Sequence, residues 1–172
     1  MRHGLYTLLA FFATVSFTAC SDEDSSSLPK GPDRPNKPIV VIYENDAHCA
    51  IDGYARFAGI RNSMRKETPH VATVSVGDFI QGGVVGTVSS GTAIVDIMNH
   101  VRYDAVTLGN HEFDFGMAQM FSLTKRLEAD VVCANFRSLI DDNLLLEPYT
   151  IKKYGNVDIA YLGLTAPSTL VT

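Results

Sequence analysis

From residue 39 onward, short apolar runs alternate with segments whose apolar side chains recur at helical spacing, and this alternation limits the fold most. Residues 39–43 form a continuous run that is mostly β-branched, which predicts a strand buried on both faces. Further strands are expected over 71–76, 104–108 and 130–133, and helices over 53–66, 92–101 and 116–128. This order predicts an α/β fold of layered type, with a mostly parallel sheet and flanking helices.

The helix expected over 53–66 has two distinct sides. Its apolar residues have the spacing of one helical face, so four side chains are predicted to be buried: Tyr54, Phe57, Ile60 and Met64. The basic residues of the same segment are assigned to the solvent side: Arg56, Arg61, Arg65 and Lys66. The segment is therefore predicted to be a surface helix that covers the sheet.

Two segments near the end of the chain are predicted to pair as a hairpin. Residues 149–154 and 157–162 are both rich in β-formers, and Gly155-Asn156 separates them. Gly-Asn is a two-residue turn signal, so these strands are expected to be antiparallel and to form an edge of the sheet.

Composition and charge exclude several classes of protein. The 172 residues are 46% hydrophobic and 19% charged, which is typical of a globular chain and suits one domain or a piece of a larger one. The net charge of −5 argues against a nucleic acid polymer as partner, because such binding needs a clustered basic face. Cys49 and Cys133 have apolar neighbours and are expected to be small buried side chains, with a disulfide between them left open.

The N-terminus has the order of an export signal. Arg2 and His3 precede an apolar run over 5–19, which is too short to span a bilayer as a helix but matches the apolar core of a signal peptide. Small residues then precede Cys20, as in a bacterial lipobox, and acidic residues follow it. We predict a lipoprotein signal peptide over 1–19 and lipidation of Cys20. The alternative is a buried N-terminal helix with an incidental cysteine.

The resemblance to a lipobox implies a membrane partner and a location. The lipid on Cys20 would anchor the protein in the outer membrane, and the acidic tail resembles the signal for the cell surface of Gram-negative bacteria. Residues 20–38 hold four of the seven prolines and little to bury, so they are expected to be a flexible tether. The folded part is expected over 39–172.

Polar side chains that can bind a metal ion follow three of the predicted strands. Asp46 and His48 follow the first, Asp78 the second, and Asn110 and His111 the third. The carboxyl ends of parallel strands lie at one edge of a sheet, so these residues can converge there. Carboxylate, imidazole and amide groups together are typical of a site for divalent metals. Each cluster alone is equally consistent with a helix cap or a turn, and only their combination favours a metal centre.

The spacing within these clusters suggests how metal ions would be held. Asp46 and His48 are two residues apart, so in an extended chain both side chains point the same way and can hold one ion together. Asp78 has two oxygens and could bridge two ions, and Asn110 offers a neutral oxygen.

These motifs resemble those of a known family. The first three motifs of the calcineurin-like metallophosphoesterases are similar to Asp46-Ala47-His48, to Gly77-Asp78 and to the run Gly-Asn-His-Glu-Phe-Asp at 109–114. The resemblance runs from about Ile39 to Leu164 and is closest to the 5′-nucleotidase branch. It implies a layered metallophosphoesterase-like sheet with flanking helices, which would be incomplete in this chain.

The resemblance also implies roles for the site residues. Two divalent ions (Mn, Zn, Fe, Co or similar) would be bound, the first by Asp46 and His48 and the second by Asn110, with Asp78 bridging them. His111 would steady the phosphoryl group in the transition state, and Asp114 would orient His111. The implied activity is hydrolysis of a small phosphorylated substrate such as a nucleotide, by a nucleotidase-type phosphomonoesterase.

The later motifs of the family are not found in this sequence, and no histidine follows His111. The chain is therefore expected to be about the first half of a phosphatase domain, and to be hydrolytically inert or nearly so by itself. A non-catalytic surface lipoprotein that keeps the phosphoesterase scaffold is the alternative. His70 and His100 are expected to be structural or exposed.

Overall fold

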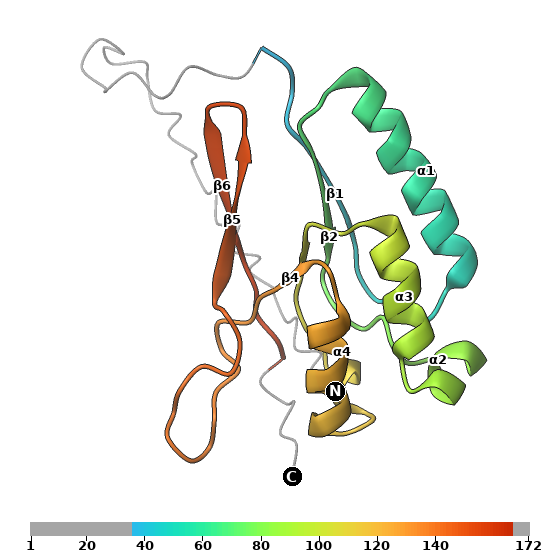
Figure 1. Ribbon diagram of the computed structural model, residues 1–172, viewed down its shortest axis with the longest axis vertical. Coiled ribbons are helices and arrows are strands. Elements are labelled where there is room, and N and C mark those ends of the chain that lie inside the picture. The colour runs from blue at the N-terminus through green and yellow to red at the C-terminus, as the bar shows by residue number, and fades with distance from the viewer. Residues whose placement is uncertain (1–35, 167–172) are drawn as a thin grey trace, which may run out of the picture. The chain divides into compact units, whose positions relative to one another are not determined.

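The computed structural model describes residues 36–166 (Figure 1). The predicted signal peptide over 1–19, the lipidation site Cys20 and most of the predicted tether lie outside the described residues. Within the described part of the chain, no helix combines the length and the apolar character that crossing a bilayer requires.

The centre of the fold is a parallel sheet of four strands. These are β1 (Val40–Glu44), β2 (Val71–Ser75), β3 (Ala105–Val106) and β4 (Asp130–Val131), and they lie side by side in the order of the sequence. β1 and β2 pair along their whole length, with Val40 opposite Val71, whereas β3 and β4 contribute two residues each. All four carboxyl ends therefore lie at the same edge of the sheet, as expected for the α/β fold.

Helices connect the strands and cover one face of the sheet. They are α1 (Ile51–Glu67), α3 (Thr92–Val101) and α4 (Met117–Arg126), and the short α2 (Val84–Ser89) packs against α3. Sequential parallel strands joined by right-handed crossovers place their helices on the same face, and Figure 1 shows α1 and α3 together on one side of β1 and β2. The predicted arrangement of a parallel sheet with flanking helices is confirmed.

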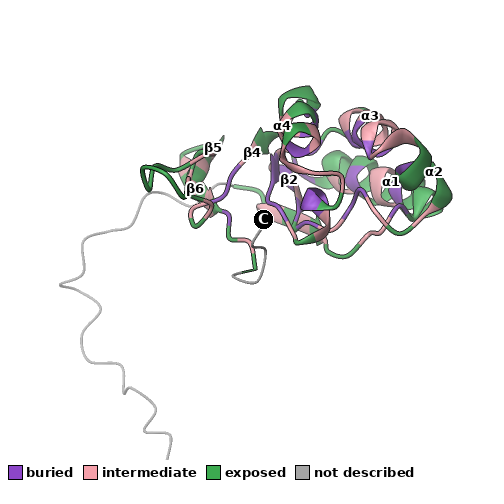
Figure 2. Ribbon diagram, turned by 90° about the horizontal axis from the view of Figure 1, so that it is seen from below, coloured by how far each residue is buried: buried purple, intermediate pink, exposed green. Residues whose placement is uncertain are grey.

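The hydrophobic core lies between the sheet and these helices. Figure 2 shows buried residues gathered in the strands and on the inner sides of the helices. The largest side chains with almost no exposed surface are Phe79, Ile80, Ile94, Met98 and Leu108. Cys49 and Cys133 are both buried and both free, as expected for small apolar side chains.

The predicted hairpin is confirmed with its predicted bounds. β5 (Tyr149–Tyr154) and β6 (Val157–Leu162) pair antiparallel in full register around the Gly155-Asn156 turn. The hairpin forms a separate sheet of two strands, so the expectation that it is an edge of the parallel sheet is wrong. Its base is attached beside β4, because the amide of Cys133 donates to the carbonyl of Glu147 at 2.8 Å.

The expectation that the first strand is buried on both faces is wrong for this structure. The exposure of β1 alternates along the strand, with Val41 44% and Tyr43 70% exposed on one face. β1 is an edge strand of the described sheet, and α1 and its neighbours cover only the face toward which Val40, Ile42 and Glu44 point. A run of β-branched residues predicts a strand, but it does not show whether one face or both faces of that strand are covered.

The assignment of sides in α1 is wrong at two neighbouring positions. Ile60 is 52% exposed, whereas Arg61 is 6% exposed and donates from its guanidinium to the carbonyl of Val101 at the end of α3. An arginine can lay its alkyl part against an apolar surface and satisfy its polar end with a backbone acceptor, so its charge alone did not reveal its side. Tyr54 is buried, as predicted.

Two short elements had no counterpart in the sequence prediction. They are α2, with six residues, and the 3₁₀ turn η1 (His111–Phe113). Both are too short to show an apolar repeat, so periodicity could not indicate them.

Candidate metal centre

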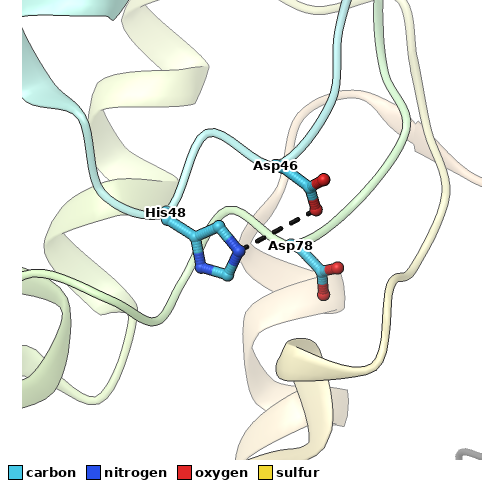
Figure 3. Close-up of side chains that lie close together, drawn as sticks. All are labelled: Asp46, His48 and Asp78. Atoms are coloured by element: carbon cyan, nitrogen blue, oxygen red, sulfur yellow. Dashed lines mark ion pairs between the residues drawn. The ribbon is translucent and has the colours of Figure 1, made fainter.

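Three of the predicted metal ligands converge beyond the carboxyl ends of β1 and β2. Asp46 and His48 come from the loop after β1 and Asp78 from the loop after β2, and each offers one ligand atom within 4.8 Å of the others. Figure 3 shows the three side chains directed toward a common space, with His48 Nε2 3.8 Å from Asp46 Oδ1. Such a separation leaves room for an ion between the side chains.

The backbone that presents these ligands is not extended. The φ angles of Asp46, His48, Cys49 and Asp78 are 55°, 42°, 62° and 57°, so four residues that are not glycine adopt the left-handed region. Each such residue costs on the order of 1 kcal/mol or more and persists only where its surroundings fix it. The explanation by extended spacing is therefore wrong, although Asp46 and His48 do approach one another.

Hydrogen bonds between the two loops maintain this conformation. The amide of His48 donates to the carbonyl of Asp78 at 2.9 Å, and the amide of Asp46 donates to the carbonyl of Gly77 at 3.3 Å. His48 Nδ1 donates to the carbonyl of Gln81 at 3.0 Å. Because a carbonyl can only accept, this bond fixes the proton on Nδ1 and leaves the Nε2 lone pair toward Asp46 and Asp78.

His111 and Asp114 lie beside this group as a hydrogen-bonded pair. His111 Nδ1 is 2.8 Å from Asp114 Oδ2, and the His111 ring is 5.0 Å from the His48 ring, measured between centroids. The hydrogen bond to the Asp114 carboxylate raises the pKa of His111, and partial burial opposes this only in part. The pair therefore places an imidazole with a stabilised positive charge next to the three converging ligands.

Asn110 follows β3 at the same edge of the sheet and is exposed. It begins η1, and its main-chain carbonyl accepts the amide of Phe113 at 3.3 Å. The amide of its neighbour His111 donates to Asp78 Oδ1 at 2.8 Å, which connects the loop after β3 to the ligand on the loop after β2.

Sequence reasoning gave no role to Glu112, although the structure makes it central to the loops of this site. The residue is 2% exposed, and its carboxylate accepts backbone amides from the loops after β2 and β3. Burial raises the pKa of Glu112, and the backbone hydrogen bonds counteract it. The sequence carries no signal for this role, because the partners of Glu112 are backbone amides, which every residue except proline has.

The donor set fits a divalent transition metal. Two carboxylates and one imidazole combine hard and borderline ligands, which suit Mn, Zn, Fe and Co. Within residues 36–166 this is the one group of three or more His, Cys, Asp or Glu side chains arranged closely enough to hold an ion.

Comparison with known proteins shows the class to which this fold and site belong. The family model for calcineurin-like phosphoesterases matches residues 39–165, so the chain belongs to that family, whose members use a dinuclear site of divalent metals.

Several relatives are nucleotidases. The chain is 33% identical over 153 residues to a bovine 5′-nucleotidase, and the match covers 76% of this chain and 27% of that protein. It is 31% identical over 148 residues to the trifunctional nucleotide phosphoesterase protein YfkN of Bacillus subtilis, covering 74% of this chain and 10% of the relative. The chain thus spans about a quarter or less of the length of these curated relatives.

Solved structures agree on the fold. The structure of a 5′-nucleotidase precursor from Thermus thermophilus matches with a TM-score of 0.66 at 27% identity, covering 75% of this chain and 29% of that one. The calcineurin-like phosphoesterase YfkN from Bacillus subtilis also gives 0.66, at 25% identity, and covers 75% of this chain and 48% of that one. The described sheet and helices therefore form part of a larger metallophosphoesterase fold.

Proposed function

We propose that this chain belongs to a phosphoester hydrolase of nucleotidase type that depends on two divalent metal ions. The observation that carries the proposal is the convergence of Asp46, His48 and Asp78 within 4.8 Å, with the hydrogen-bonded pair of His111 and Asp114 beside it. The substrate class is supported by the names of relatives, which are 5′-nucleotidases and, for one solved structure from Haemophilus influenzae, an NAD nucleotidase.

In this proposal, Asp46 and His48 hold the first ion, Asp78 bridges both ions, and Asn110 contributes to the second. Bound ions of this kind acidify a water and offset the charge of phosphoryl oxygens. The residues of the chain position the reactants. Asp114 favours the protonated form of His111, which would donate a hydrogen bond to a phosphoryl oxygen as negative charge develops. Asp114 would act through His111 by orienting its ring and favouring its protonated form.

We further propose that the 172-residue chain by itself is hydrolytically inert or nearly so. Four candidate ligands cannot complete two sites of about six ligands each, so the second ion would be held loosely and the attacking water would not be aimed. The sequence downstream of the codon for Thr172 would identify a longer product with Gly-His and His-x-His motifs.

The test compares release of phosphate from AMP, with Mn²⁺ present, by the 172-residue chain and by any longer in-frame product. The proposal predicts turnover by the longer product and its loss in Asp78→Asn. Turnover by the longer product that is unchanged in Asp78→Asn would contradict the proposed site. Steady turnover by a monodisperse sample of the 172-residue chain would contradict the proposed inactivity.

A non-catalytic surface lipoprotein that retains the phosphoesterase scaffold is the second candidate. The observation that favours it is that, in the described part of the chain, the His, Cys, Asp and Glu side chains form one group that can hold an ion, whereas the family uses two ions. Absence of any in-frame continuation, together with binding of Mn²⁺ without hydrolysis, would support this candidate over the enzyme.

We also propose that the protein is exported and anchored to the outer membrane, at the cell surface, through a lipid on Cys20. The apolar run over 5–19, the small residues before Cys20 and the acidic residues after it support this. Labelling of cells with a palmitate analogue should mark the wild-type protein and leave Cys20→Ala unmarked. Labelling that persists in the variant would contradict lipidation at this cysteine.

A further inference from the structure

We propose that Glu112 is a positioning residue that locks the loop after β2 to the loop after β3 and so holds Asp78 beside His111. The inference rests on the proposed function, because its importance depends on Asp78 being a metal ligand. Its structural part, the connection between the two loops, can be tested without any metal.

The hydrogen bonds of the Glu112 carboxylate define the lock. Oε2 accepts the amide of Asp78 at 2.8 Å and the amide of Gly109 at 2.7 Å, so a single oxygen connects the two loops. Oε1 accepts the amides of Phe79 at 2.9 Å and Ile80 at 3.4 Å. Three successive amides of one loop and one amide of the other therefore converge on one side chain.

The backbone conformation at the end of β2 provides this convergence. Gly77 has a φ of 103° and Asp78 a φ of 57°, and this turn directs the following amides toward the same point. Consecutive amides in such a turn form a concave site for an anion. Here the anion is the Glu112 carboxylate, and its hydrogen bonds stabilise the left-handed conformation of Asp78.

Because the Glu112 carboxylate is buried, its hydrogen bonds to the four amides are strong, and losing them leaves buried groups without partners. Glu112 is 2% exposed, and buried amides without partners are disfavoured, so the side chain and the four amides depend on one another. No basic side chain is among the groups that lower the pKa of Glu112, whereas the amides of Asp78, Phe79 and Gly109 are. The backbone amides thus replace a counter-ion.

A second contact transmits the position of the locked loops to the candidate site. Asp78 Oδ1 accepts the amide of His111 at 2.8 Å, and His111 is adjacent in the chain to Glu112. Asp78 is therefore fixed at its amide by Glu112 and at its carboxylate by His111. A shift of the Glu112 carboxylate would move the loop that carries Asp78 relative to the loop that carries Asn110 and His111.

The test uses Glu112→Gln, which keeps the shape of the side chain but replaces one accepting oxygen with an NH₂ group. That group faces amide donors and cannot accept from them, so one pair of hydrogen bonds is lost. Two controls accompany it. Glu147→Gln makes the same change at an exposed side chain, and Val101→Ala weakens the core at the end of α3, away from both loops.

The first readout is amide hydrogen exchange by NMR in the metal-free chain. The amides of Asp78 and Gly109 lie outside helices and strands, yet in the wild type we expect both to exchange slowly, since Glu112 protects them. Exchange should accelerate in Glu112→Gln at one of the two pairs of amides, Asp78 and Gly109 or Phe79 and Ile80, according to which pair the NH₂ group faces. Both pairs should exchange as in the wild type in Glu147→Gln. Fast exchange of these amides in the wild type would overturn the lock even if the variant does not fold.

The second readout is the affinity for Mn²⁺, measured by titration calorimetry. Groups that orient a metal ligand typically change affinity by about 10- to 100-fold when removed, and we expect a loss of that order in Glu112→Gln. Val101→Ala should keep the wild-type affinity although it is less stable. An unchanged affinity in Glu112→Gln, or an equal loss in Val101→Ala, would overturn the positioning role. A wild-type chain that binds no Mn²⁺ would refute the metal site instead, while slow exchange at Asp78 and Gly109 would still identify the lock.

Discussion

Replacing Gly109 with alanine should disturb the candidate metal centre from a position that carries no functional group. A Cβ atom on Gly109 would lie 2.2 Å from Asp78 Oδ1 and 2.4 Å from Asp78 Cγ. Non-bonded heavy atoms are most stable about 3.5–4 Å apart, so the Asp78 carboxylate must move by about 1 Å or more. This movement would break the hydrogen bond that Asp78 Oδ1 accepts from the amide of His111.

The loss of stability in Gly109→Ala can be estimated from these contacts. Forcing an extra methyl group into a packed site costs about 1–3 kcal/mol, and losing a hydrogen bond to a charged acceptor costs about 1.5–3 kcal/mol. Alanine has less conformational entropy than glycine in the unfolded chain, and this offsets about 0.4–1 kcal/mol of the loss. We therefore expect the free energy of unfolding to fall by about 2–5 kcal/mol, a large part of the total for a domain of this size.

The assay is urea unfolding followed by circular dichroism, together with calorimetric titration of Mn²⁺. Gly59→Ala is the matched control, because a Cβ on Gly59 in α1 would meet nothing within 4 Å. Alanine is the better helix former, so the control should gain about 0.5–1 kcal/mol and keep the wild-type affinity for Mn²⁺. The reasoning would be refuted if Gly109→Ala unfolded like the wild type and bound Mn²⁺ with unchanged affinity.

Three further predictions concern single side chains. In Asp114→Asn, the pKa of His111 should fall, as measured by NMR titration of the metal-free chain, because the carboxylate that raises it is gone. Since that pKa is raised on folding, the pair stabilises the fold below the ordinary histidine pKa, and this contribution should disappear as the pH rises through the raised value. In α1, Arg61→Ala should lower the free energy of unfolding by about 1–3 kcal/mol, whereas Ile60→Gln should change it by less than about 0.5 kcal/mol. In any longer active product, Asp78→Asn should reduce phosphate release more than Asp114→Asn, and equal losses would contradict a bridging role for Asp78.

The parts of the fold that the sequence predicted are those set by local signals. The hairpin of β5 and β6 follows from Gly155-Asn156 between two strand-forming segments, and α3 has its predicted bounds because its apolar residues repeat over ten positions. The exposed face of β1 was missed because coverage of a strand depends on elements distant in the sequence. The burial of Arg61 was missed for the same reason, since its acceptor, the carbonyl of Val101, belongs to another helix.

In the candidate site too, local signals were predicted from the sequence, and contacts between distant residues were not. The residue types and their places after successive strands indicated Asp46, His48 and Asp78, and the structure brings these three together. The left-handed backbone that presents them could not be read from residue types, because it depends on contacts between loops. Glu112 was missed because its partners are backbone amides, which every residue except proline carries and which therefore leave no mark in the sequence.

Calorimetric titration of the 172-residue chain with Mn²⁺, beside its Asp78→Asn and Asp158→Asn variants, tests the metal centre most directly. Asp158 lies on β6 and forms an ion pair with Lys153, so its variant makes the same chemical change away from the site. The account predicts one tight site in the wild type, the same site in Asp158→Asn, and its loss in Asp78→Asn. Absence of binding by the wild type, or equal affinity in all three proteins, would contradict the account.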